Sequence, residues 1–234
     1  MVKEELIQRS PVRVFMNSIH GGLKAGELGL IASPSGIGKT SMLVQIAMDK
    51  LLQGKRVIHI SFTQHTDYVL AWYEDIFNEI IRKRNLEDEE EVKNDIVKNR
   101  VIMRFTQEGH PVESIIKSLT ALIGDGGFRA DCIIVDGFNF KTENRERFSK
   151  VKTFAAEMGV SVWYSCNVQG AEPLYDKRNI PLVIKNYEEL IEVVIMMEAK
   201  QSHISLSVSK DRDNYNPEQM ALKLDPRTLL IMES

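Results

Sequence analysis

A segment near the N-terminus combines small residues with a lysine and a threonine in an order that suits phosphate binding. Residues 28–41 read LGLIASPSGIGKTS, an apolar run followed by small residues and then Gly-Lys-Thr. Backbone N–H groups of a loop between a strand and a helix can converge on phosphate oxygens, and the positive end of the helix dipole favours the anion. Gly36 and Gly38 permit the tight backbone path that this requires. The segment therefore predicts a phosphate-binding loop.

Two side chains at the end of this loop have expected roles. Lys39 would reach the β- and γ-phosphates of a nucleotide, and the Thr40 hydroxyl would ligate Mg²⁺. The strict pattern has glycine where this chain has Ser33. The alternative is a chance Gly/Ser-rich turn, which the flanking apolar periodicity disfavours. The expected nucleotide-binding residues are Ser35, Gly36, Ile37, Gly38, Lys39, Thr40 and Ser41.

A carboxylate suited to the same metal ion follows a second apolar run. Residues 131–137 read DCIIVDG, so four apolar residues lead to Asp136. Ligands of open α/β sheets bind at the carboxyl ends of the strands, where Asp136 would lie. Any buried strand could end in aspartate, so the run is informative only together with the loop. Thr40 and Asp136 are the predicted Mg²⁺ ligands.

Alternating apolar runs and amphipathic segments predict the elements that position these residues. Strands are expected at 27–32, 56–62, 101–105, 132–135 and 160–166, and helices at 39–53, 67–84, 112–123 and 144–158. This order favours βαβ units around a mostly parallel sheet. Four short strand candidates, 193–197, 203–209, 219–224 and 228–232, predict an antiparallel extension of that sheet. We expect residues 1–20 to form a loosely packed arm and residues 21–234 to form one domain.

Composition narrows the class of protein. The 234 residues are 43% hydrophobic and 27% charged, which is typical of a globular chain. A formal charge of −3 gives no overall basic field that would attract nucleic acid or a membrane surface. Cys132 and Cys166 are too few for a disulfide framework. Without a signal-like start or a long apolar run, we expect a cytoplasmic protein that does not enter a membrane.

The residues before the loop extend the pattern to a known family. Residues 18–28 read SIHGGLKAGEL, which resembles the Gly-Gly-Leu-x-x-Gly-Glu-Leu lead-in of the RecA-type P-loop ATPases, in the branch that contains KaiC, RadA and the DnaB helicases. The resemblance covers roughly residues 18–232. It implies a RecA-like α/β fold with a mostly parallel central sheet, flanking helices and a C-terminal antiparallel extension. It also implies ATP and Mg²⁺ as ligands.

The resemblance assigns roles to three residues outside the loop. Asn167 matches the position of a polar γ-phosphate sensor, although an asparagine that caps a strand end would look the same. Lys210 and Arg212 are similar to a Lys-x-Arg element that completes the nucleotide site of a neighbouring subunit, which implies a homo-oligomer in which both act in trans. The alternative is a charged surface turn.

One departure from the family bears on catalysis. Gln64 stands where the family has a glutamate that polarises the attacking water. Glutamine can orient water but cannot take its proton. The expected catalytic residues are Lys39, Gln64, Asn167, Lys210 and Arg212.

The resulting expectation is an oligomeric ATPase with weak or partner-dependent hydrolysis. One alternative is a nucleotide-gated regulatory or assembly protein without meaningful catalysis. Another is a helicase-like or loader protein that grips single-stranded DNA with residues 137–147 and 168–185, where aromatic and basic residues alternate. Acidic residues in both stretches make nucleic-acid binding the less favoured hypothesis.

Overall fold

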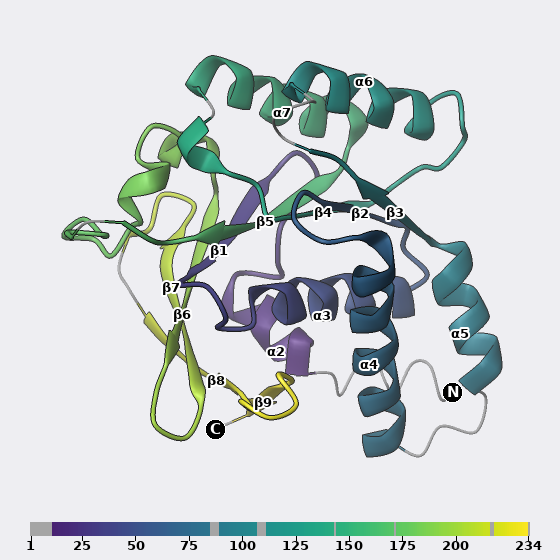
Figure 1. Cartoon of the computed structure of the whole chain (residues 1–234), viewed down its shortest axis with the longest axis horizontal. Helices are drawn as coiled ribbons and strands as arrows, with labels where there is room; N and C mark the ends of the chain where they lie inside the picture. The colour runs from purple at the N-terminus through teal and green to yellow at the C-terminus, as the bar shows by residue number, and fades with distance from the viewer. Residues whose placement is uncertain are drawn as a thin grey trace.

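The computed structural model describes residues 11–84, 89–106, 111–142, 144–170, 172–215 and 218–233. Within these residues one sheet of nine strands forms the centre of the molecule (Figure 1), in the order β3-β2-β4-β5-β1-β6-β7-β8-β9. The strands are β1 Leu28–Ser33, β2 Val57–Ser61, β3 Arg100–Arg104, β4 Cys132–Asp136, β5 Ser161–Asn167, β6 Val193–Ala199, β7 Ile204–Asp211, β8 Glu218–Leu224 and β9 Ile231–Glu233. The first six are parallel to one another, and β7 to β9 continue the sheet antiparallel. This confirms the predicted α/β architecture with an antiparallel C-terminal extension.

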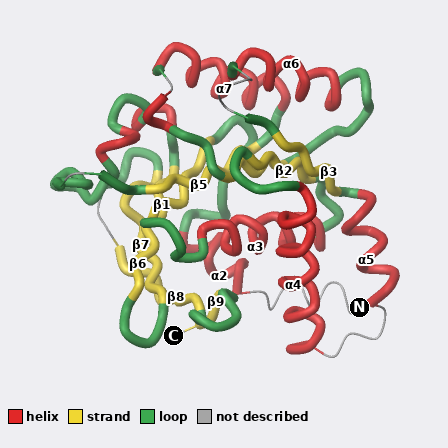
Figure 2. Tube along the Cα trace, in the orientation of Figure 1, coloured by secondary structure: helices red, strands yellow, loops and turns green. Residues whose placement is uncertain are grey.

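Helices cover both faces of the sheet. Helices α2 Pro11–Ser18, α3 Lys39–Leu52, α4 Thr66–Arg84 and α5 Glu89–Lys98 lie on one side, and α6 Val112–Ile123 and α7 Arg145–Met158 lie on the other (Figures 1 and 2). Short 3₁₀ helices occur at Phe140–Thr142, Leu182–Ile184 and Glu188–Leu190. Because both faces are covered, β1, β2 and β4 are buried along their whole length, which explains their continuous apolar runs.

Two helices were not predicted. Helix α2 falls in the segment that we expected to be a loosely packed arm, and this expectation is wrong over residues 11–18. Its Phe15 is fully buried, with its ring centroid 6.1 Å from that of Trp163. Residues 1–10 of the expected arm lie outside the described residues. The sequence did not predict helix α5, because it is strongly charged and has few apolar residues. Two of these, Val92 and Ile96, are buried.

A fully buried histidine lies in the layer between the sheet and α4. His59 Nδ1 is 3.1 Å from the Tyr73 hydroxyl, and its Nε2 is buried with no hydrogen-bond partner among the described residues. Burial lowers the pKa of His59 to about 4; Asp136 opposes this shift and Arg100 adds to it. The ring is therefore neutral in the folded chain near neutral pH.

This histidine should make stability depend on pH. In the unfolded chain His59 titrates near its ordinary pKa, so between about pH 6.5 and 4 the unfolded state binds a proton that the folded state does not. Stability is thus retained above this window and lost as pH falls through it. From pH 7 to 5 the loss should be about 2 kcal/mol in the free energy of unfolding.

Urea unfolding at the two pH values measures this loss. The double variant His59→Leu/Tyr73→Phe removes both the ring and the hydroxyl that faces it. Between pH 7 and 5 its free energy of unfolding should therefore fall by about 2 kcal/mol less than that of the wild type. Equal losses in both proteins would show that His59 does not carry the effect.

Candidate functional site

The predicted phosphate-binding loop follows β1 and leads directly into α3. Gly36 has a φ of 81°, and Gly38, the residue before α3, has a φ of 93°. Both values lie in the left-handed region that favours glycine. Gly38 also offers no side chain to cap the first N–H groups of α3. The loop therefore has the backbone form that anion binding at a helix N-terminus requires.

The Lys39 ammonium lies across this loop. Its Nζ donates hydrogen bonds to the Ser33 carbonyl at 3.0 Å, the Ser33 hydroxyl at 3.2 Å and the Pro34 carbonyl at 2.8 Å. Burial lowers the pKa of Lys39, although Cys166 and Asp136 oppose this shift. All three hydrogen-bond acceptors are neutral, so the positive charge is held beside the loop without a direct anionic partner among the described residues.

Thr40 and Asp136, the predicted Mg²⁺ ligands, are in contact. The Thr40 hydroxyl donates to Asp136 Oδ2 at 2.8 Å, although the two residues are 96 positions apart in sequence. Asp136 ends β4 and is only 4% exposed. A hydroxyl and a carboxylate are hard oxygen donors, the type that Mg²⁺ prefers when it also binds substrate phosphates. These residues therefore fit the metal ion that the sequence implied.

Asn167 lies beside the loop, as a phosphate sensor would. It ends β5, the strand between β1 and β4, and its register partner in β1 is Ser33. The backbone N–H of Val168 donates to the Ser33 carbonyl at 3.0 Å, which extends this pairing past the strand end. The exposed Asn167 side chain is thus at the same sheet edge as Lys39 and Asp136.

Gln64 also belongs to this edge. Its backbone N–H donates to the Ser61 hydroxyl at 3.0 Å, and Ser61 is paired in register with Asp136. Its side-chain Oε1 is buried with no hydrogen-bond partner among the described residues. A hollow of about 220 Å³ opens nearby, lined by Thr63, Gly137, Phe138, Asn139, Phe140, Lys141, Cys166, Asn167, Gln169 and Val183. Thr63, the residue before Gln64, lines this hollow, whereas Gln64 itself does not.

The side chain of Ser41 has a different task from the one expected of a phosphate-binding residue. It is fully buried, and its hydroxyl donates to the Leu229 carbonyl at 2.9 Å. Gln45 donates to the same carbonyl at 2.8 Å and accepts from the Ile231 N–H at 2.9 Å. Ser41 and Gln45 thus connect the turn between β8 and β9 to the first half of α3 by hydrogen bonds. If Ser41 binds phosphate, it would do so through its backbone N–H.

Lys210 lies away from the loop within its own chain. It pairs with Val194 near the start of β6, and because β6 is parallel to β1, this is the opposite sheet edge. Lys210 is 4% exposed, and its Nζ donates to the Glu188 and Ile191 carbonyls, both at 2.5 Å. These contacts give Lys210 a structural task that the sequence did not indicate.

Arg212 follows β7 at the same edge and is also engaged within its chain. Its guanidinium donates to Glu27 Oε2 at 2.8 Å, to the Gly22 carbonyl at 3.0 Å and to Asp211 Oδ1 at 2.5 Å. The action of Lys210 and Arg212 on a neighbouring subunit stays a prediction, and any such action would have to compete with these contacts.

Two aromatic residues of the 137–147 stretch, which were expected to stack on bases, are interior residues, whereas Tyr175 in the 168–185 stretch is half-buried. Phe138 is 6% exposed and Phe140 is 3% exposed. Both pack against Phe148 and Tyr164, with ring centroids between 5.5 and 6.2 Å apart. They cannot stack on bases in this conformation. The nearby Arg178 is paired with Asp176 and Glu188.

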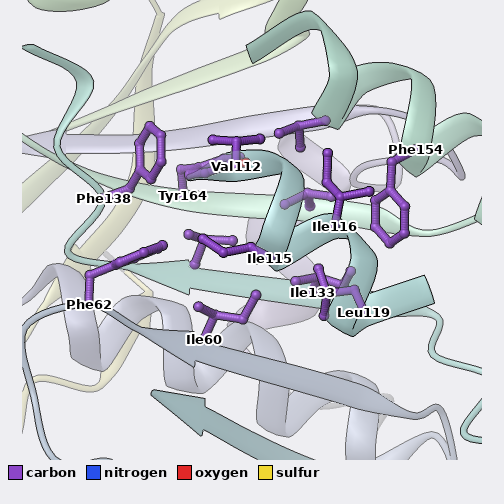
Figure 3. A pocket seen from close by; sticks show the side chains of 13 residues that line it. Ile60, Phe62, Val112, Ile115, Ile116, Leu119, Ile133, Phe138, Phe154 and Tyr164 are labelled. Carbon is purple, nitrogen blue, oxygen red and sulfur yellow. The ribbon is translucent and has the colours of Figure 1, made fainter. Parts of the chain in front are cut away.

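A small apolar cavity lies between the sheet and α6 (Figure 3), with a volume of about 30 Å³. Aliphatic and aromatic side chains line it, among them Ile60, Ile115, Ile133 and Phe154. It has room for about one water molecule but no polar site to hold it. We interpret this cavity as a packing void outside the candidate site.

Comparison with models of known protein families and with curated protein sequences finds no match for this chain. Among the described helices, none combines the length and the apolar character needed to cross a membrane.

Proposed function

We propose that the chain is a Mg²⁺–ATP-binding ATPase of the RecA type, related to the branch with KaiC, RadA and the DnaB helicases. The observation that carries the proposal is the 2.8 Å hydrogen bond from Thr40 to Asp136. It joins the second residue of α3, directly after a glycine-containing loop, to the carboxylate at the end of β4. This is the juxtaposition that a P-loop requires for a metal–nucleotide complex.

Lys39 is placed to exchange partners when a nucleotide binds. Its ammonium leaves the Ser33 and Pro34 carbonyls and bonds to the charged oxygens of the β- and γ-phosphates. Charge-assisted hydrogen bonds are about twice as strong as neutral ones, so this exchange favours binding. Thr40 and Asp136 would hold Mg²⁺, which would neutralise charge on the phosphates.

Gln64 and Asn167 support a slow hydrolytic reaction. The Oε1 of Gln64 is buried here, so its side chain would have to turn toward the site to orient the attacking water, and an amide cannot remove the proton. Asn167 would donate its side-chain amide to the γ-phosphate. Because a general base typically contributes about 10²–10⁴-fold to a rate, turnover without one should be slow.

Two measurements on the wild-type chain test the proposal. The first is equilibrium binding of ATP in the presence of Mg²⁺ and in the presence of a chelator, where Mg²⁺ should strengthen binding. The second is phosphate release over a series of protein concentrations, where a rise steeper than linear would indicate sites shared between subunits. No ATP binding at millimolar concentrations would overturn the proposed function.

The Gln64→Glu substitution should raise the rate of phosphate release by about 10²-fold, because it supplies a carboxylate that can act as a base. The rate is measured at saturating Mg²⁺–ATP, beside the exposed Gln201→Glu variant as a control for added charge. A wild-type rate in Gln64→Glu, with ATP binding retained, would favour the alternative of a nucleotide-gated regulatory protein.

A further inference from the structure

Ser165 is a buried serine in contact with the predicted metal carboxylate. Its hydroxyl donates to Asp136 Oδ1 at 2.6 Å, and it is 3% exposed. The Ser165 hydroxyl oxygen also accepts a hydrogen bond from the Gly137 backbone N–H at 2.8 Å. The Gly137 bond occupies an acceptor position of the hydroxyl and leaves its proton for the carboxylate. The direction of the Ser165–Asp136 bond is thereby defined.

The two oxygens of Asp136 are held from two sides. Oδ1 accepts from Ser165 on β5, and Oδ2 accepts from Thr40 at the start of α3. Rotation of the carboxylate would break both bonds. Thr40 would also ligate Mg²⁺, whereas Ser165, on the far side of the carboxylate, has no such role. Ser165 therefore keeps Oδ2 directed toward the metal position whether or not Thr40 changes partner.

A second serine lies beside Asp136 in the sheet and contacts Gln64. Ser61 on β2 pairs in register with Asp136 on β4, and the Ser61 hydroxyl accepts the Gln64 backbone N–H. Ser61, Asp136 and Ser165 are at most 4% exposed, so they form a row across three neighbouring strands that water does not reach freely.

We propose that Ser165 is a positioning residue that orients Asp136 for Mg²⁺ bound with the nucleotide. The inference rests on the proposed function. Residues that hydrogen-bond to metal ligands typically change metal affinity by about 10–100-fold when they are removed. Loss of the Ser165 hydroxyl leaves Oδ1 without this donor and frees the carboxylate to rotate. The phosphate-binding groups of the loop, by contrast, remain intact.

The test compares Ser165→Ala with the wild-type chain in ATP binding at a series of Mg²⁺ concentrations. We expect the half-saturating Mg²⁺ concentration to rise by about 10–100-fold, with ATP affinity in chelator unchanged. Ser161→Ala is the matched control, since Ser161 lies on the same strand and its hydroxyl is 3.3 Å from the Asp131 carbonyl. This control should keep the wild-type Mg²⁺ dependence.

Two further variants keep the inference testable. If Ser165→Ala does not fold, Ser165→Cys retains a side chain of similar size with a weaker donor, and it should raise the Mg²⁺ requirement by a smaller factor. In the Asp136→Asn background, Ser165→Ala should cause little additional change, because the two residues act on Mg²⁺ as one unit.

Three results would overturn the inference. The first is an unchanged Mg²⁺ dependence in folded Ser165→Ala, and the second is an equal loss of ATP affinity with and without Mg²⁺. Either would leave the proposed function standing if the wild-type chain binds Mg²⁺–ATP. The third is a wild-type chain that binds no ATP at any Mg²⁺ concentration, which would remove the proposed function and the inference together.

Discussion

Lys39→Ala should lower the affinity for Mg²⁺–ATP by at least about 100-fold and abolish phosphate release. Hydrogen bonds to charged groups contribute about 1.5–3 kcal/mol each, so loss of one or two of them to the phosphates accounts for this factor. The expected loss is large because the ammonium is already at the loop, with its Nζ 2.8 Å from the Pro34 carbonyl.

The measurement is a titration of Mg²⁺–ATP, with thermal unfolding recorded in parallel. Lys39 is partly buried among neutral acceptors, so its removal should change stability far less than binding. Lys24→Ala, at an exposed position before β1, is the matched control and should bind like the wild type. Retained affinity in Lys39→Ala would contradict the assignment of this loop as the nucleotide site.

Lys210→Ala should reduce the free energy of unfolding by about 3 kcal/mol, because it removes the ammonium that donates to the buried Glu188 and Ile191 carbonyls. Burial lowers the pKa of Lys210, and the nearby carboxylates of Glu188, Glu192 and Asp213 oppose this shift. The ammonium therefore connects the segment before β6 to β7. Chemical denaturation measures the effect, with the half-exposed Lys200→Ala as the control.

The role in trans predicts a different result for the same variant. Stability would be unchanged, phosphate release would fall, and mixing with Lys39→Ala protein would restore part of the activity, because each variant would supply what the other lacks. A stable, inactive Lys210→Ala chain that is rescued in this way would contradict the structural role.

Much of the fold could be predicted because it depends on local patterns. Continuous apolar runs such as residues 132–135 identify strands covered on both faces, and β4 extends this run by a single residue, Asp136. Helix α6 has the predicted bounds, since its apolar residues recur with the helical period. By contrast, β9 begins three residues after the predicted position 228, because residues 225–230 form a turn fastened to α3.

The loop around Lys39 and the carboxylate of Asp136 could both be identified from the sequence alone. Glycine spacing and an apolar run with a polar end are local features that a linear pattern records. The folded chain was needed to show that Ser165 holds Asp136, that Ser41 anchors the turn after β8, and that Lys210 is buried. A serine or lysine has the same appearance in a sequence whether it is solvated or buried. Its role depends on which strands become neighbours, and that follows from packing across the whole sheet.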